Sequence, residues 1–168
     1  LTDWVPSTER DHRRGRLVEL AAKISARFPA LRLTDDASQR VSDLAFDIGE
    51  RASVAGEVVD AAQRFAATQG ARTFTSSIHF HVTWDGCDKA SGAVRFLAER
   101  FRLDATEARW RYAFIGDSGN DAAAFAAFDL AVGVRNVRGR FTRPPRFVTK
   151  GSCGEGFVEM VDALLGAC

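Results

Sequence analysis

The sequence predicts an α/β protein built in two parts, on three observations. In the C-terminal half, short continuous apolar runs alternate with helical segments, the pattern of a parallel sheet covered on both faces. In the N-terminal half, strands follow one another along the chain, which indicates an α+β unit with an antiparallel sheet and two helices. The order of predicted strands and helices changes from one pattern to the other near residues 86–89. We therefore predict two domains, residues 1–87 and 88–168.

The N-terminal part opens with an amphipathic helix. Ser7 and Thr8 are its candidate N-cap residues, and apolar side chains then recur at helical spacing up to Pro29. Four strands are expected at 31–33, 41–48, 71–76 and 78–84. A second helix over 54–69 should end at Gly70.

The C-terminal part alternates helices and strands. Helices are expected at 89–101, 122–128 and 156–165, and strands at 112–115, 130–134 and 147–149. Asp104 or Thr106 is expected to cap a short helical turn. The glycines at 151, 154 and 156 with Ser152 fit two readings, a phosphate-cradling loop or a plain loop at the start of the last helix.

Composition excludes several classes of function. Lys and Arg number 23 against 22 Asp and Glu, so no overall field would recruit nucleic acid or a membrane surface. The cysteines form no Cys-x-x-Cys pair, which favours a reducing compartment. No apolar run approaches the ~20 residues that cross a bilayer. A cytoplasmic protein without nucleic-acid or membrane partners is expected.

The most informative stretch is Tyr112 to Asp121, where an apolar run ends at a glycine and then delivers two carboxylates, a hydroxyl and an amide. Polar groups at the carboxyl ends of strands are where open α/β sheets bind ligands. Asp117 and Asp121 are four residues apart, so a turn entering a helix can direct both at one cation. Oxygen ligands favour Mg²⁺ over zinc.

Two other readings of this stretch compete with a metal site. Ser118, Asn120 and Asp121 are all good N-cap types, so the segment could simply start a helix. A serine esterase with Ser118 as nucleophile is the other, but such an enzyme needs a general base. The three histidines, at 12, 79 and 81, all precede Ser118, and nothing after it can play that part.

Residues 112–137 resemble the closing motif of haloacid dehalogenase-superfamily phosphatases with a type IIB cap, a group that includes mannosyl-3-phosphoglycerate and sucrose-phosphate phosphatases. The resemblance rests on a strand, Gly-Asp-Ser-x-Asn-Asp at 116–121, an alanine-rich helix and the run 130–137. Asp88-Lys89-Ala90-Ser91-Gly92-Ala93, opening a helix, is similar to the family's lysine motif. Segments 42–47 and 76–79 are similar to its cap. The implied fold is the C-terminal half of a Rossmann-like core with an α+β cap.

The resemblance also implies roles for the site residues. Asp117 would ligate Mg²⁺ directly, while Asp121 and Asn120 would hold the ion through water or orient its shell. Lys89 would neutralise the phosphoryl oxygens and the attacking group. In the cap, Arg40, Asp43, Ser77 and His79 would contact the sugar or glycerate part of a small phosphorylated substrate.

His79 and His81 have their own alternative, because His-x-His is a zinc-ligand spacing. No third ligand is evident near them in the sequence, which favours a polar sheet face over a zinc site.

One family feature is absent from the sequence. The attacking group in this family is an aspartate in an Asp-x-Asp motif after the first core strand, and no apolar run here delivers such a pair. The expectation is a Mg²⁺-dependent sugar-phosphate phosphatase whose nucleophile lies in a missing N-terminal half, so that these 168 residues alone are inactive. The alternative is a non-catalytic phosphate- or metal-binding module.

Overall fold

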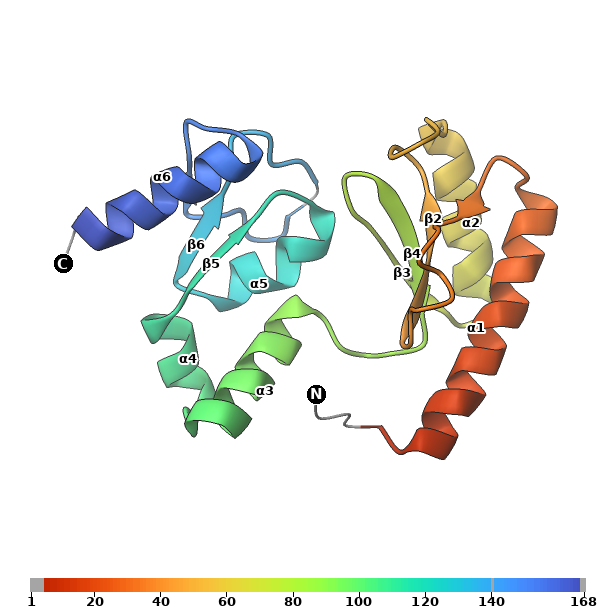
Figure 1. Ribbon diagram of the computed structural model, residues 1–168, viewed down its shortest axis with the longest axis horizontal. Coiled ribbons are helices and arrows are strands. Elements are labelled where there is room, and N and C mark those ends of the chain that lie inside the picture. Colours follow the sequence, from red (N-terminus) through yellow and green to blue (C-terminus); the bar gives the residue numbers. More distant parts are fainter. Residues whose placement is uncertain (1–4, 140, 167–168) are drawn as a thin grey trace. The chain divides into compact units, whose positions relative to one another are not determined.

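The computed structural model describes residues 5–139 and 141–166 and divides into two compact units, Leu1–Gly86 and Cys87–Cys168. Figure 1 shows the order of the elements in each unit. The division falls one residue before the predicted boundary between residues 87 and 88. Each unit is described by itself below.

The first unit is an antiparallel four-stranded sheet with two helices on one face (Figure 1). The strands lie in the order β1 (Arg32–Leu33), β2 (Asp43–Asp47), β4 (His79–Thr83) and β3 (Arg72–Thr75). The helices are α1 (Ser7–Arg27) and α2 (Gly56–Thr68). The predicted α+β unit is therefore confirmed.

The core of this unit lies between the sheet and its helices. Leu44 and Phe46 of β2 and Phe80 of β4 point into it, and the rings of Phe46 and Phe80 stack with centroids 5.7 Å apart. Because side chains alternate along a strand, Asp43 and His81 lie on the opposite face of the sheet. That face is polar, and neither helix of the unit packs on it.

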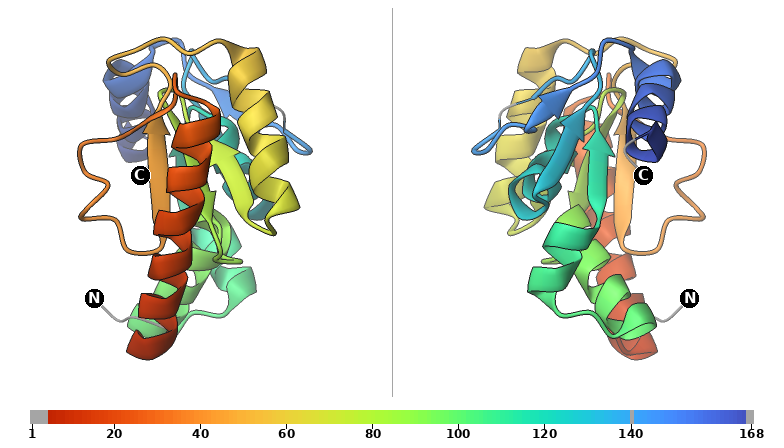
Figure 2. Two further views of the ribbon diagram at one scale, coloured as in Figure 1. Left: turned by 90° about the vertical axis from the view of Figure 1, so that its right-hand side faces the viewer. Right: turned by 90° about the vertical axis from the view of Figure 1, so that its left-hand side faces the viewer.

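The second unit is a parallel three-stranded sheet in the order β5 (Ala113–Gly116), β6 (Leu130–Gly133) and β7 (Phe147–Val148). Its helices are α3 (Lys89–Phe101), α4 (Ala105–Arg111), α5 (Ala122–Ala127) and α6 (Cys153–Gly166). Residues of α3, α4 and α5 form one apolar cluster with Phe114 and Phe128. Figure 2 shows α6 on the other face of the sheet, as the predicted two-sided covering requires.

Several predicted helix boundaries were wrong. Pro6, not Ser7 or Thr8, is the N-cap of α1, and it makes no side-chain cap bond. The last helix begins at Cys153 instead of residue 156, since the Cys153 N–H already has an acceptor in Asn136 Oδ1 at 2.9 Å. A 3₁₀ turn, η1 (Gly119–Asp121), precedes α5.

Other boundary signals were read correctly. Of the two candidate caps before α4, Asp104 is the one used, in a capping box with Glu107. Gly70 follows α2 with φ of 79°, a conformation that glycine adopts without steric cost.

Among the helices that the structure describes, none has the length and apolar character of a membrane span.

Candidate active site

The site is built at the carboxyl end of β5, where the chain turns into η1. Phe114 holds the strand in place, with its ring 5.8 Å from that of Phe125 and 5.9 Å from that of Phe128. The strand ends at Gly116, and Asp117 and Ser118 form the turn that follows. The apolar strand therefore delivers the polar residues to one edge of the sheet, as predicted from the sequence.

Asp121 organises the turn from inside. Its side chain is only 1% exposed, and its Oδ2 accepts hydrogen bonds from the backbone N–H of Asp117 at 2.9 Å and of Ser118 at 3.1 Å. A carboxylate that accepts two backbone N–H groups closes the turn and fixes both peptide planes.

Gly116 makes this arrangement possible, and sequence reasoning missed it. A Cβ at position 116 would lie 2.5 Å from Cγ and 2.8 Å from Cβ of Asp121. The buried carboxylate therefore needs a residue without a side chain at the end of β5. The Gly-Asp dipeptide at the end of the apolar run is the signal in the sequence that could have indicated it.

Lys89 is the cation of the site. It is the first residue of α3, and its Nζ lies 2.5 Å from Asp121 Oδ1 and 3.1 Å from Asn120 Oδ1. Its side chain is 49% exposed, so the ammonium is anchored on one side and reaches solvent on the other. The structure thus joins the lysine motif to the Gly-Asp-Ser-Gly-Asn-Asp turn, 32 residues apart.

The Asp117 carboxylate is the uncommitted acid of the site. Its backbone carbonyl accepts the Arg138 N–H at 2.8 Å, but within residues 5–139 and 141–166 its side chain has no hydrogen bond or ion pair. Asp121, in contrast, has both oxygens engaged. The spacing in the sequence suggests equivalent roles for Asp117 and Asp121. In the described structure the Asp121 carboxylate is bound by protein groups, whereas the Asp117 carboxylate is free.

Ser118 is a structural residue of the turn. It is 5% exposed, and its Oγ donates to Asn120 Oδ1 at 2.9 Å. No imidazole contacts it in the part of the chain that the structure describes, and the histidines all belong to the first unit. Nothing in these contacts would activate it as the nucleophile of an esterase.

The donor set suits a hard cation. Asp117 supplies a free carboxylate, whereas the Asn120 amide oxygen already accepts from Lys89 Nζ and Ser118 Oγ. Mg²⁺ is commonly held by one or two carboxylates while water and substrate phosphate complete its shell. In the described residues no three His, Cys, Asp or Glu side chains gather as a metal cluster. A fully protein-made cage, as for structural zinc, is therefore not what this site offers.

The glycine-rich loop before α6 already holds an anion from the protein itself. The Glu159 carboxylate accepts the N–H groups of Lys150 and Gly151, each at 2.9 Å, and these bonds lower the pKa of Glu159. The Cys153 N–H is bonded to Asn136. Of the two interpretations offered by the sequence, a plain loop at the start of the last helix accounts for these contacts without a bound phosphate.

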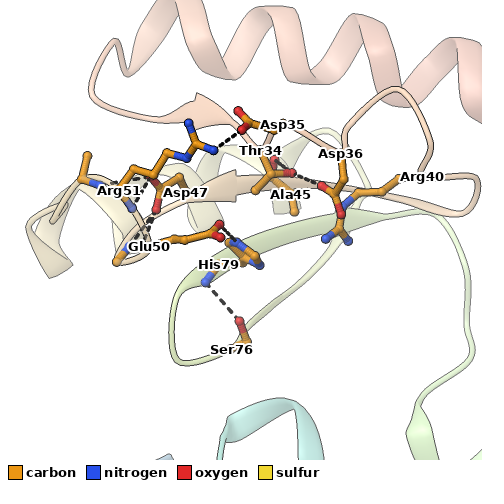
Figure 3. Close-up of polar contacts among 12 residues, drawn as sticks. Thr34, Asp35, Asp36, Arg40, Ala45, Asp47, Glu50, Arg51, Ser76 and His79 are labelled. Carbon is orange, nitrogen blue, oxygen red and sulfur yellow. Dashed lines mark hydrogen bonds and ion pairs between the residues drawn. The ribbon is translucent and has the colours of Figure 1, made fainter.

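The four predicted cap residues lie in the first unit, and of these only Arg40 and Asp43 are joined by a hydrogen bond. Arg40 donates from Nη1 to Asp43 Oδ2 at 2.9 Å and from Nε to Asp36 at 2.9 Å. His79 Nε2 lies 2.9 Å from Glu50 Oε2 (Figure 3). Ser77 is an exposed turn residue between β3 and β4, and no side-chain contact joins it to the others.

His81 joins the Arg40–Asp43 group and was not among the predicted site residues. Its Nδ1 lies 2.8 Å from Asp43 Oδ2, and its ring stacks on Phe74 with centroids 4.5 Å apart. Burial alone would raise the pKa of Asp43, but the His81 hydrogen bond and the charge of Arg40 outweigh it, and that pKa is lowered. Both histidines are bound to carboxylates, and no zinc cluster forms among the described residues.

Comparison with known proteins agrees with this geometry. Phosphoglycolate phosphatases of Pyrobaculum neutrophilum and Archaeoglobus fulgidus are 40% identical over 97 residues and 28% identical over 106 residues. The aligned segments cover 56% and 63% of this chain, but 40% and 45% of those proteins. The chain thus spans less than half the length of these curated relatives.

Solved structures share the fold. A Thermoplasma acidophilum protein superposes with a TM-score of 0.66 at 24% identity, over 89% of this chain and 61% of that one. The sucrose-phosphatase of Synechocystis sp. PCC6803, solved with sucrose and phosphate, gives 0.59 at 17% identity, over 89% and 64%. A haloacid dehalogenase-like hydrolase of Bacteroides thetaiotaomicron gives 0.58 at 14% identity, over 89% and 66%. The predicted Rossmann-like core with a cap is confirmed.

The family model of sucrose-6F-phosphate phosphohydrolase matches residues 2–159, which is nearly the whole chain and includes every residue of the site described above. This chain therefore belongs to the sucrose-6F-phosphate phosphohydrolase family of the haloacid dehalogenase superfamily.

Proposed function

We propose that the complete protein is a Mg²⁺-dependent phosphatase that hydrolyses a sugar phosphate or a phosphorylated sugar acid. The observation that carries the proposal is the pairing of a half-exposed Lys89 ammonium, held by buried Asp121, with the uncommitted carboxylate of Asp117 at the end of β5. Phosphoryl transfer requires charge stabilisation and positioning more than covalent help from the protein, and a fixed cation beside a metal-binding carboxylate offers both.

Each residue has its role in this proposal. Asp117 is the direct ligand of Mg²⁺, because its carboxylate is free of other partners within the described residues. Asp121 orients the groups around the ion without binding it directly, since its oxygens accept from two backbone N–H groups and Lys89. Asn120, whose amide oxygen accepts from Lys89 and Ser118, orients the shell of the ion. The bound ion would neutralise charge on the phosphoryl oxygens.

In addition to the metal ion, Lys89 would bind a phosphoryl oxygen. Its Nζ donates to Asp121 and Asn120 and carries one hydrogen beyond those two bonds. An ammonium fixed at one end can bind a phosphoryl oxygen with little further loss of side-chain freedom. Two unit charges at 4 Å interact by about 4 kcal/mol at an effective dielectric of 20, which is enough to affect a barrier.

The attacking carboxylate is proposed to come from outside these 168 residues, as an aspartate that forms an aspartyl-phosphate. The resemblance supplies this role, and the chain offers no Asp-x-Asp at the end of an apolar strand. β5 is an edge strand of its sheet in the described structure, and an edge strand can accept a further strand. We propose that the part bearing the nucleophile pairs there.

The test is an activity assay of the complete gene product with Mg²⁺ on sucrose 6-phosphate, trehalose 6-phosphate and phosphoglycolate. Asp117→Asn should lower kcat at least 100-fold, the order expected when a charge-stabilising group is lost. Asp129→Asn is the matched control, because Asp129 is paired with Arg146 and should leave activity unchanged.

Activity that survives Asp117→Asn undiminished would contradict the proposed role of Asp117. Mg²⁺-dependent phosphate binding without turnover in the complete protein would instead support the non-catalytic alternative. Turnover by the 168 residues alone would show that the nucleophile lies within them.

A further inference from the structure

A groove of about 510 Å³ lies between the two helices of the first unit, and we call it the helix groove. Its lining comes from the end of α1 and from the C-terminal half of α2: Arg27, Phe28, Ala61, Arg64, Phe65 and Thr68. No strand contributes to this lining, so the helix groove lies on the helical side of the unit and not on its polar sheet face (Figure 1). Its volume is in the range of small-molecule sites.

The helix groove carries two guanidinium groups and no carboxylate. Arg27 and Arg64 are both exposed, and within the described residues neither has a hydrogen bond or an ion pair. Arg40, in contrast, is shared between two aspartates. Two uncompensated positive charges that line one groove favour an anion as the ligand.

Two phenylalanine rings hold one of these guanidinium groups. The rings of Phe28 and Phe65 lie edge to face with centroids 6.1 Å apart. Cζ of Arg27 lies 5.2 Å from the centroid of the Phe65 ring and 5.9 Å from that of the Phe28 ring. Ring contacts of this kind position a guanidinium without using its N–H groups, which stay available to an acceptor.

The helix dipole accounts for only one of the two arginines. Arg27 lies in the last turn of α1, where the free carbonyl groups favour a cation. The last turn of α2 has no basic residue, and Arg64 lies before it. Like charges that line the same groove repel each other, and an anion bound between them would relieve that repulsion.

The lining selects the chemical class of the anion. A phosphate monoester carries about 1.5 to 2 negative charges at neutral pH, which matches two guanidinium groups, whereas a carboxylate carries one. The phenylalanine rings offer apolar surface to a planar ring. Thr68 Oγ donates to the Phe65 carbonyl oxygen at 2.7 Å, so its lone pairs can accept from a ligand hydroxyl.

We propose that the helix groove binds a nucleoside monophosphate. Its phosphate contacts Arg27 and Arg64, its base packs on the phenylalanine rings, and a ribose hydroxyl donates to Thr68 Oγ. The groove belongs to the first unit, and the Lys89–Asp117 turn to the second. Binding needs neither Mg²⁺ nor turnover, so this inference does not rest on the proposed phosphatase function.

The test is isothermal titration calorimetry of the full 168-residue chain with AMP. The buffer contains EDTA, which removes divalent cations, and has low ionic strength, because salt screens exposed charges. AMP should bind saturably with Kd below about 1 mM. Adenosine offers the ring without the charge, and inorganic phosphate offers the charge without the ring. Each should bind about tenfold more weakly than AMP or less tightly still, because each lacks one set of contacts.

Variants locate the bound AMP. Arg27→Gln and Arg64→Gln should each weaken binding about tenfold, the effect of losing one hydrogen bond to a charged group. Arg51→Gln is the matched control, because it removes the same charge from the same unit, but Arg51 is paired with Asp35 and does not line the groove. Lys89→Gln removes the cation of the second unit. Both of these variants should bind AMP like the unmodified chain, and circular dichroism checks that all four are folded.

Each outcome decides the inference. Absence of saturable AMP binding overturns it, and so does adenosine or inorganic phosphate that binds as tightly as AMP. Equal weakening by Arg51→Gln and Arg64→Gln would show a nonspecific effect of net charge and overturns it as well. Binding that is lost in Lys89→Gln and kept in Arg64→Gln overturns it and supports the proposed phosphatase site instead. AMP binding in the groove of a complete protein without phosphatase activity upholds it and contradicts the proposed function.

Discussion

Asp121 lies against the backbone at the end of β5 only because position 116 has no side chain. In Gly116→Ala the new Cβ would lie 2.5 Å from Asp121 Cγ, so the buried carboxylate must move away from the N–H groups it holds. We expect a loss of about 1–3 kcal/mol in the free energy of unfolding, as for other overpacked sites. Urea unfolding monitored by circular dichroism measures it.

Gly92→Ala is the matched control for that substitution. Gly92 lies inside α3, and nothing is within 4 Å of the position its Cβ would take. Alanine is a better helix former than glycine, so this variant should gain up to ~1 kcal/mol. Equal effects of the two substitutions would contradict the steric explanation for Gly116.

Asp36 makes stability depend on pH in acid. The bonds from Arg40 and Thr34 lower the pKa of Asp36 to about 2 in the folded chain, from an ordinary value of 3.8. A group whose pKa is lower when folded stabilises the protein above its unfolded pKa and loses that contribution as pH falls through the folded value. Asp36→Asn should therefore flatten the loss of stability between pH 3.8 and about 2. Thermal melts across that range decide it, and parallel profiles would contradict the assignment.

The predicted site residues Lys89, Asn120 and Asp121 contact one another in the structure, but the sequence did not predict how Asp121 is used. The spacing of Asp117 and Asp121 and the family motif bring Lys89 to the same turn, and the structure places Lys89 on Asp121. Whether a carboxylate is free or bound to backbone depends on the exact turn, here a 3₁₀ turn entered from Gly116. Spacing alone carries no such information.

At the scale of elements, the start of α3 is fixed by a capping box that also places Lys89. Asp88 Oδ1 accepts the Ser91 N–H at 2.8 Å, and the Asp88 N–H donates to Ser91 Oγ at 2.9 Å. Asp88→Ala should cost about 1 kcal/mol of the free energy of unfolding, the usual value of an N-cap. Asp60→Ala, at an exposed position within α2, is the control and should cost nothing. Similar losses in both variants would show that the box is not important.

The periodicity of apolar residues predicted the existence and type of each main element, because a helix or strand that buries one face has apolar residues at a regular spacing. The ends were less predictable, since they depend on partners distant in sequence. The start of α6 is an example, where Asn136 accepts the Cys153 N–H from 17 residues away. His81 was missed for a related reason, because its partner Asp43 becomes a neighbour only when β2 and β4 pair.

At the scale of the whole molecule, the first unit has what an independent domain needs. Its apolar core is contributed by α1, α2 and the sheet, all within Leu1–Gly86. Residues 1–86 expressed alone should therefore unfold in one cooperative thermal transition with retained helix and strand signals. A gradual loss of far-ultraviolet circular dichroism would contradict this expectation.

The Glu159 carboxylate of α6, bound to the loop before that helix, affects whether free phosphate can bind to the loop. A free phosphate that approaches the Lys150 and Gly151 N–H groups must displace an anion that belongs to the same chain. Short tethers give effective concentrations in the millimolar range. Of the three glycines only Gly151 lies in this loop, because α6 begins at Cys153, and the internal competitor should make the loop insensitive to phosphate well below that range.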